Sequence, residues 1–250
     1  NDSFIDTAYI GDLGGNIWRF SFCKLADVGR CGISGQTVNW NGSLFFNASG
    51  SRQPIFTVPS VAMDKQQNIW VYWGTGDKTD PTYKPTSGIY DYMYGVKDPT
   101  LSSTYGVSDV YEITSSTDTY SLSSGLAGYR IRLNGIGEKV LADSVVFGGH
   151  LYFTTYTPAT TTTDPCVQAG TAMLYDIQYT SGSGRTISLG DGIASAPVLS
   201  LKPGGTGIPD LYVTTSGGGG LSASTQRVNI NPPGNEERNK LRYWKDRRVE

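Results

Sequence analysis

The sequence predicts an all-β protein of the β-propeller class. Its composition is rich in glycine and tyrosine, with 32 Gly, 16 Tyr and only 17% charged residues. Short segments of β-branched and aromatic residues recur along the chain in a fixed order. No amphipathic run of about 12 residues with helical periodicity interrupts them. A chain of 250 residues also has enough material for a large buried core.

The recurring element is a strand with an apolar-Tyr-apolar-small pattern. A second apolar segment and a turn precede the last three copies, so each of these pairs is expected to form a hairpin. The four copies are Ala8–Asp12, Val71–Gly76, Leu151–Thr155 and Leu211–Thr215.

Two further strands accompany each hairpin and complete a four-stranded unit. An alternating strand follows it at Asn16–Phe20, Tyr92–Val96 and Met173–Ile177, with Leu241–Trp244 as the candidate fourth copy. Another strand precedes it at Pro54–Thr57, Gly128–Arg132 and Arg185–Ser188. Four strands per repeated unit are typical of a propeller blade, whereas a β-sandwich is the alternative.

The domain prediction is one propeller domain over residues 1–250, with the first blade incomplete at the N-terminus. Only the last two strand types are present in the first unit. An open set of blades exposes sheet edges and an apolar face, so we expect the missing N-terminal part of the same protein to be a partner. A small ring that closes on itself is the alternative.

Two segments rich in serine and threonine, 100–124 and 157–164, are predicted to be loop insertions rather than strands. The first contains 13 Ser or Thr in 25 positions. Such segments are usually solvated surface loops, and loops often carry contact surfaces. Tyr105, Tyr111 and Tyr120 are candidate stacking groups, and a solvated loop without a partner is the alternative reading.

Charge and residue counts exclude several classes of function. The net charge is −2 and the pI is near 5.5, which disfavours nucleic-acid binding because phosphates require a basic face. A zinc site built on several histidines is impossible with one histidine, His150, which lies at a turn and is expected to be solvated. No apolar run reaches the length of a membrane span.

The three cysteines do not form a zinc or redox motif. Cys23 and Cys31 flank a short glycine-containing loop, and in an oxidising compartment they are a candidate disulfide. Free thiols are the alternative for this pair. Cys166 is then left over, either free or paired with sequence outside this chain.

Acidic residues at the turns favour local capping over catalysis. Asp77 and Asp80 follow a strand end and are expected to cap the turn through hydrogen bonds to backbone groups, with a metal ligand as the alternative. Asp12 and its glycines fit a tight turn between strands, with Trp18 packed between blades. No helix follows these glycines, so they do not form a phosphate loop.

The segment Tyr9–Phe20 strongly resembles the signature of the C-terminal propeller of the PilY family, the type IV pilus tip-associated adhesins and assembly factors. Further matches follow in the family's order and cover nearly the whole chain: Val71–Asp77, Tyr94–Asp98, Ala142–Gly149, Tyr152–Pro158, Gly192–Leu199 and Leu211–Gly219. Each motif alone is weak, because quinoprotein-like propellers share the Gly-Asp and Trp features, but the ordered set is specific.

The resemblance implies a non-enzymatic protein that is exported through the periplasm to the pilus tip or outer cell surface. It implies roles in pilus biogenesis, adhesion and twitching motility, with type IV pilins, minor pilins and a host or abiotic surface as partners. It also implies that these are the C-terminal blades of a larger propeller of about seven blades, within the usual four to eight.

The resemblance further implies calcium regulation through a loop of the form Asp-x-Asx-x-Asp-Gly-x-x-Asp. Asp2 and Asp6 match its fifth and ninth positions, with Ser3 in place of the usual glycine. Calcium takes about six to eight oxygen ligands, so two carboxylates form only part of a site. We therefore expect calcium binding once the upstream loop residues are present. The alternative is that both are solvated terminal residues.

Two other functions remain open at this level. A quinoprotein-like dehydrogenase would need a cofactor pocket at the propeller axis with a catalytic carboxylate, which these motifs do not assemble. A scaffold propeller of the outer membrane is a third reading. The repeat pattern supports the fold and does not choose among these functions.

Overall fold

The described part of the chain is built almost entirely from β-strands. The computed structural model describes residues 7–22, 40–48, 50, 53–85, 88–159, 170–200, 209–217 and 223–230. The helical segments in this part are two short 3-10 turns, η2 (Val107–Asp109) and η3 (Leu122–Ser124). None of its helices is long and apolar enough to cross a membrane. The all-β prediction is confirmed.

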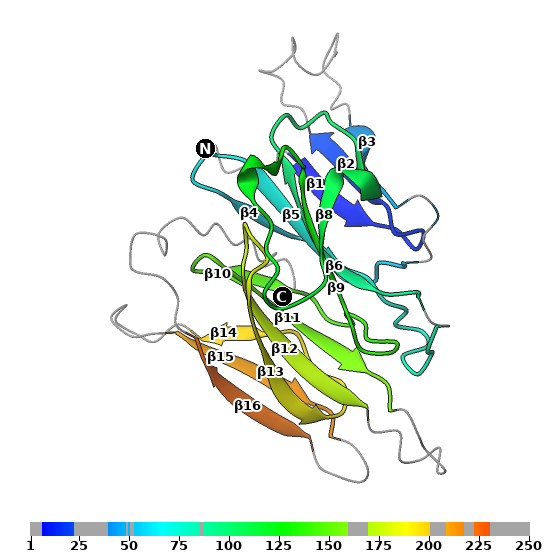
Figure 1. Cartoon of the computed structure of the whole chain (residues 1–250), viewed down its shortest axis with the longest axis vertical. Coiled ribbons are helices and arrows are strands. Elements are labelled where there is room, and N and C mark those ends of the chain that lie inside the picture. Colours follow the sequence, from blue (N-terminus) through cyan, green and yellow to red (C-terminus); the bar gives the residue numbers. More distant parts are fainter. Residues whose placement is uncertain are drawn as a thin grey trace, which may run out of the picture.

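The strands form four sheets that follow one another in chain order (Figure 1). The first sheet contains β1 (Thr7–Gly11), β2 (Ile17–Phe22), β3 (Trp40–Asn47) and β7 (Tyr105–Gly106). The second contains β4 (Ser60–Met63), β5 (Ile69–Gly74), β6 (Tyr92–Asp98), β9 (Gly128–Arg132) and β8 (Val110–Ile113). The third contains β10 (Val145–Phe147), β11 (His150–Thr157), β12 (Thr171–Gln178) and β13 (Gly184–Asp191). The fourth contains β14 (Val198–Ser200), β15 (Asp210–Thr215) and β16 (Ser224–Asn229).

A hydrophobic core lies between each pair of consecutive sheets. The first and second sheets enclose a cluster that includes Phe45, Phe46 and Trp73. The second and third enclose one that includes Trp70 and Phe153, and the third and fourth enclose a third cluster. Sheets that pack face to face in sequence order, each against its neighbours, are the blades of a propeller. The predicted fold class is therefore confirmed.

The boundaries of the blades differ from the prediction. Gly128–Arg132 (β9) and the strand around Arg185–Ser188 (β13) pair with β6 and β12, the strands that follow the preceding hairpins, so they belong to the second and third sheets. In the second sheet β9 lies between β6 and β8, whereas β13 is the outer strand of the third. Pro54–Thr57 forms no strand. In the fourth sheet the strand after the hairpin is β16, while 241–244 lies outside the described residues. The order of strands along the sequence does not show whether a strand joins the preceding or the following sheet.

The central strands are buried on both faces because each blade is covered on two sides. Five consecutive residues of β5 and six of β11 are buried, which explains their continuous apolar and aromatic sequences. Gly95 in β6 lets the Tyr129 ring cross the strand, since a Cβ there would lie 2.7 Å from Tyr129 Cζ. The cores between the first three blades are rich in aromatic side chains, whereas the core between the third and fourth is mostly aliphatic.

One turn structure occurs twice, at Asp12 and at Asp64. Each carboxylate accepts hydrogen bonds from the backbone and side-chain amides of the Asn four residues later and from the indole of the Trp six residues later. The predicted turn at Asp12 is confirmed. Trp70 is fully buried, whereas Trp18 is 39% exposed in the first sheet, so its packing between blades stays a prediction.

A buried lysine holds the long β5–β6 connection. The Lys139 ammonium donates hydrogen bonds to the carbonyl oxygens of Asp80 (3.2 Å), Pro81 (3.1 Å) and Tyr83 (2.9 Å). The side chain is 1% exposed, and its backbone pairs in both directions with Tyr156 of β11. Lys139 therefore ties a loop of the second blade to the third blade.

The carboxyl group of Asp91, near the Lys139 ammonium, makes the stability of the fold depend on pH. Burial raises the pKa of Asp91 to about 6, although the Thr75 hydroxyl and the Lys139 ammonium lower it. The folded state therefore keeps this proton after the unfolded chain has lost it, so Asp91 lowers stability as pH rises from about 4 to about 6.

Asp91→Asn is expected to raise the free energy of unfolding at pH 7 by about 1–3 kcal/mol, because the amide is neutral and its oxygen still accepts from Thr75. Below pH 4 the variant and the parent should be alike. Urea unfolding at pH 4, 5, 6 and 7 measures both. Equal stability at all four values would contradict the assignment.

Candidate functional site

The serine- and threonine-rich segment 100–124 is paired with two blades. Within it, β7 pairs parallel with β3 at the edge of the first sheet, and β8 pairs parallel with β9 at the edge of the second. The prediction that this segment contains loops rather than strands is therefore wrong at 105–106 and 110–113. Both added strands cover a sheet edge that would otherwise present unpaired backbone groups.

The same segment also contacts the third blade. The Tyr120 backbone N–H donates to the Ser181 carbonyl oxygen at 3.0 Å, and the Thr119 hydroxyl donates to the same oxygen at 3.3 Å. Ser181 lies in the turn between β12 and β13. A single insertion thus joins the edges of three consecutive blades, and its outward side chains have a fixed position.

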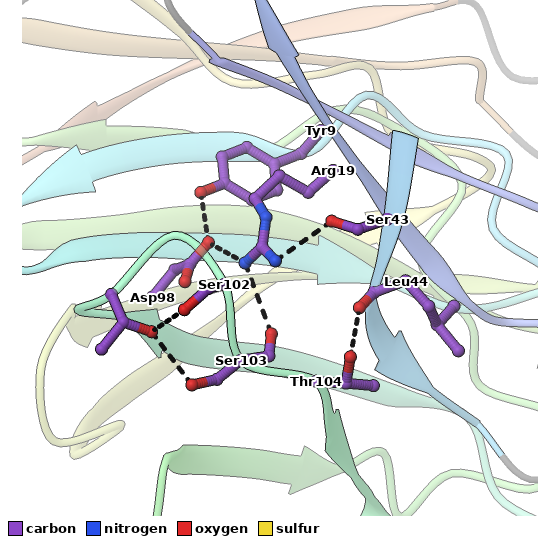
Figure 2. A network of polar contacts seen from close by, with 9 residues as sticks. Tyr9, Arg19, Ser43, Leu44, Asp98, Ser102, Ser103 and Thr104 are labelled. Atoms are coloured by element: carbon purple, nitrogen blue, oxygen red, sulfur yellow. Dashed lines mark hydrogen bonds and ion pairs between the residues drawn. The ribbon is translucent and has the colours of Figure 1, made fainter. Parts of the chain in front are cut away.

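A buried ion pair anchors the beginning of this segment (Figure 2). Arg19 of β2 and Asp98 at the end of β6 lie 2.8 Å apart, and the Tyr9 hydroxyl donates to the same Asp98 oxygen at 2.7 Å. Arg19 also donates to the Ser43 hydroxyl (3.1 Å) and to the Ser103 carbonyl oxygen (3.3 Å). The network therefore ties the first blade, the second blade and the insertion to one another.

A second contact secures the chain at the same place. The Thr104 hydroxyl donates to the Leu44 carbonyl oxygen of β3 at 2.6 Å, just before β7 begins. Together with Ser103, this contact fixes the direction in which the insertion enters the edge of the first sheet.

The ion pair is fully removed from solvent. The side chains of Arg19 and Asp98 are 1% and 0% exposed, and burial together with the Asp98 hydrogen bond raises the pKa of Tyr9. Within the described residues, Arg19 Nε and Asp98 Oδ1 have no hydrogen-bond partner. A buried charge depends strongly on its counter-charge. Removing either Arg19 or Asp98 would therefore leave the other charge unpaired and destabilise the folded state.

The exposed part of the segment is a hydroxyl-rich surface over 114–124. The Ser and Thr side chains here are exposed, and Tyr111 is 36% exposed with its hydroxyl bonded to Asp118 at 2.8 Å. Of the three candidate stacking groups, Tyr111 alone faces solvent to this extent. Tyr105 is half-buried and packs against Phe45, whereas Tyr120 is buried beside Trp70, so the prediction is wrong for Tyr120.

The predicted metal and disulfide residues lie outside the described residues. These residues are Asp2, Asp6, Cys23, Cys31 and Cys166. The calcium and disulfide predictions therefore stay predictions. Within the described ranges, no group of three or more His, Cys, Asp or Glu side chains is placed to hold a metal ion. Most of the second predicted insertion, 157–164, also lies outside these ranges.

The turn predictions have mixed outcomes. Asp77 accepts hydrogen bonds from the backbone and hydroxyl of Thr79, as expected for a turn cap, and these bonds lower its pKa. Asp80 accepts from the Thr82 hydroxyl at 2.8 Å. His150 is predicted to be solvated, but its Nδ1 lies 2.6 Å from Asp176 Oδ1, so the ring is hydrogen-bonded to β12 at the start of β11.

Comparison with known proteins agrees with the motif order. No family model matches the chain. Over 201 residues it is 25% identical to the type IV pilus biogenesis factor PilY1 homolog of Xylella fastidiosa, a match that covers 72% of this chain and 14% of that protein. The chain is thus similar in sequence to a PilY1 protein. The resemblance stated from the sequence is thereby confirmed.

Solved structures agree on the fold. The crystal structure of the Pseudomonas aeruginosa PilY1 C-terminal domain matches with a TM-score of 0.61 and 18% identity, covering 92% of this chain and 58% of that one. A match to an endo-arabinase from Bacteroides thetaiotaomicron has a TM-score of 0.32 and supports no conclusion. The PilY1-like chain thus spans a small part of the curated relative and over half of the crystallised domain.

The anchoring pair was missed by sequence reasoning. Arg19 and Asp98 both lie inside motifs quoted for the PilY resemblance, yet neither was given a role. One signal was available, because Arg19 occupies an inward position of an alternating strand, two residues after the buried Ile17. Its partner lies 79 residues away, and local periodicity carries no information about such a pairing.

Proposed function

We propose that this chain is the propeller part of a type IV pilus-associated protein with a non-enzymatic role in pilus assembly and adhesion. The observation that supports it most directly is the similarity to PilY1 proteins in both sequence and fold. In this proposal the protein is exported through the periplasm and acts at the pilus tip or outer cell surface. Its partners are pilins, minor pilins and a host or abiotic surface.

In this proposal the hydroxyl-rich surface over 114–124 is a contact surface of the propeller. Support comes from the way the segment is held, with strand pairing to two blades and hydrogen bonds to a third. A surface fixed in this way loses little conformational entropy on binding, which favours contact with a partner. Tyr111 and Asp118 lie at its exposed edge and are the side chains we expect to matter most.

We also propose that calcium regulates the complete protein through Asp2 and Asp6. The support is the match of these residues to the family's loop, with carboxylate oxygens as the preferred calcium ligands. Replacing both by alanine in the full-length protein should weaken calcium binding in isothermal titration. Unchanged calcium affinity would contradict this part of the proposal and leave the pilus role untouched.

The test of the main proposal is deletion of the gene in the source organism. We expect the deletion strain to lose surface pili and twitching while still making pilin, and the intact gene to restore both. Electron microscopy and sheared-pilus immunoblots measure piliation. Normal piliation and twitching in the deletion strain would contradict the proposal.

Complementation separates the contact surface from pilus assembly. A strain with Tyr111→Ala should make pili but attach less to surfaces. Tyr83→Ala is the matched control, because Tyr83 is 53% exposed and lies outside the segment. Equal attachment by the two strains would show that Tyr111, at the edge of 114–124, is not part of a contact surface.

A further inference from the structure

A pocket lies where three connections between strands meet, at one end of the second, third and fourth blades. Its volume is about 470 Å³, within the range of sites for small ligands. The β5–β6 connection supplies Lys78 and Pro81, the segment leading into β10 supplies residues 141–143, and the segment leading into β14 supplies residues 193–196. The lining does not include 114–124, so this pocket is separate from the contact surface proposed above.

Hydrogen bonds to neighbouring strands hold two of the three walls in place. The Lys139 ammonium holds the β5–β6 connection and donates to the Pro81 carbonyl oxygen at 3.1 Å. On the wall that leads into β14, the Ser195 carbonyl oxygen accepts from the Thr154 hydroxyl of β11 at 3.0 Å. The Ser195 backbone N–H donates to the Thr214 carbonyl oxygen of β15 at 2.8 Å. A pocket with fixed walls loses little conformational entropy when a ligand binds.

The body of the pocket is apolar. Leu141 and Ala194 line it and are each 6% exposed, whereas Ile193 is 38% exposed. Ala142 and Ala196 are further lining residues, and their small side chains leave space for a ligand. An apolar group that enters the pocket would be removed from water, which stabilises the complex.

Two charged side chains of opposite sign line the same pocket. Lys78 is exposed, and its ammonium has no hydrogen-bond or ion-pair partner within the described residues. Asp143 is exposed as well, and its Oδ1 accepts from the Val58 backbone N–H at 2.9 Å. This hydrogen bond fixes the carboxylate and leaves its second oxygen available to a ligand. The pocket therefore offers one cation and one anion.

The other carboxylates of the β5–β6 connection are engaged within that connection. Asp77 Oδ1 accepts from the backbone N–H of Thr79 at 2.8 Å and from its hydroxyl at 2.6 Å. Asp80 Oδ1 accepts from the Thr82 hydroxyl at 2.8 Å. Neither aspartate lines the pocket, so the charge that this connection presents to a ligand there is that of Lys78.

An apolar body between an ammonium and a carboxylate is complementary to a short apolar peptide, which carries the opposite charges at its two ends. We propose that this pocket binds such a peptide, with its terminal ammonium at Asp143, its terminal carboxylate at Lys78 and its side chains against the apolar lining. Exposed ion pairs contribute little free energy, so burial of the side chains supplies most of the affinity and the two charges set the direction of the peptide. The inference does not rest on the pilus role.

The test is isothermal titration of the full chain with the dipeptide leucyl-leucine. We expect saturable binding that is at least about 10-fold tighter than that of glycyl-glycine, which has the same charges and no apolar side chains. N-acetyl-leucyl-leucine lacks the ammonium and leucyl-leucinamide lacks the carboxylate, so each should bind about 3–5-fold more weakly than leucyl-leucine. Absence of saturable leucyl-leucine binding would overturn the proposal, and so would equal affinity for the blocked and unblocked peptides.

Variants locate the two charges. Asp143→Asn keeps an acceptor for the Val58 N–H and should weaken leucyl-leucine binding about 3–5-fold, while binding of N-acetyl-leucyl-leucine stays unchanged. Lys78→Met should weaken leucyl-leucine binding to a similar extent and leave leucyl-leucinamide binding unchanged. Asp109→Asn is the matched control, because Asp109 is also exposed and accepts from a backbone N–H, that of Gly106, at 2.7 Å. If both pocket variants bind leucyl-leucine as tightly as Asp109→Asn does, the pocket is not the site.

Discussion

Arg19→Met is expected to destabilise the protein by about 3–5 kcal/mol, because it leaves the Asp98 carboxylate buried without its counter-charge. Methionine keeps much of the volume of the arginine stem, so the loss reports mainly on the ion pair. The Tyr9 hydroxyl would still donate to Asp98, but one neutral hydrogen bond does not compensate a buried charge. Urea unfolding measures the change in the free energy of unfolding.

The matched control is Arg227→Met. Arg227 lies 2.7 Å from Asp210 but is 53% exposed, so its loss should cost less than about 1 kcal/mol. A second comparison also removes the Asp98 carboxylate, which Arg19→Met leaves unpaired. The double variant Arg19→Met with Asp98→Asn should be more stable than Arg19→Met alone by about 1–2 kcal/mol, since a neutral amide is cheaper to bury.

Local measurements connect this pair to the insertion. Arg19 holds the Ser103 carbonyl oxygen, so Arg19→Met should speed hydrogen exchange in β7 and β8 more than in β15. If the variant is as stable as the parent and exchange is unchanged, the pair does not anchor the segment. The contact surface proposed over 114–124 would then be held by strand pairing and by the hydrogen bonds to Ser181 without help from this pair.

Lys139→Met should destabilise the protein by about 2–4 kcal/mol, because three backbone carbonyl oxygens lose their donor at once. The loss of stability should not exceed about 4 kcal/mol, because the loop can relax and turn part of this backbone towards water. The free energy of unfolding from urea titration measures the global effect. Hydrogen exchange over 77–85 measures the loosening of the loop.

Lys78→Met is the control for this variant. Lys78 lies in the same β5–β6 connection and is exposed, so its replacement should change stability by no more than about 0.5 kcal/mol. Equal stability of the two variants would show that the Lys139 ammonium contributes nothing beyond its packing. Slower exchange over 77–85 in Lys139→Met would also contradict the clamp.

Arg19 and Lys139 connect different pairs of blades by the same physical means. Arg19 joins the first and second blades, and Lys139 joins the second and third. In each case a buried cation replaces water as the donor for groups that the strands leave unpaired. The aromatic cores bring the blades together, while these cations fix the connections that cross between them.

The sequence was most informative where periodicity is local. The apolar-Tyr-apolar pattern located β5, β11 and β15, because strands covered on both faces need continuous apolar side chains. It was least informative about which strands belong to the same sheet. The pattern assigned β9 and β13 to the following hairpin, but they pair with β6 and β12 of the preceding unit, because strand pairing depends on contacts far apart in the chain.

The polar composition of the insertion predicted a loop along its whole length. Thirteen Ser or Thr in 25 positions indicated a loop, yet β7 and β8 lie within it. Parallel pairing to an existing sheet edge supplies backbone hydrogen bonds to almost any sequence, so tertiary context overrode the polar composition. Tyr120 is buried for the same reason, because the paired segment carries it onto the Trp70 ring.

The sequence by itself determined the all-β class, the repeated blade and the relationship to PilY1 proteins, because strand periodicity and motif order are written along the chain. Only the tertiary structure decided which strands share a blade, that the insertion joins three blades, and that Arg19 and Lys139 have the neighbours that give them a role. Those properties depend on contacts between residues far apart in the sequence, and a sequence pattern does not show which distant residues come into contact.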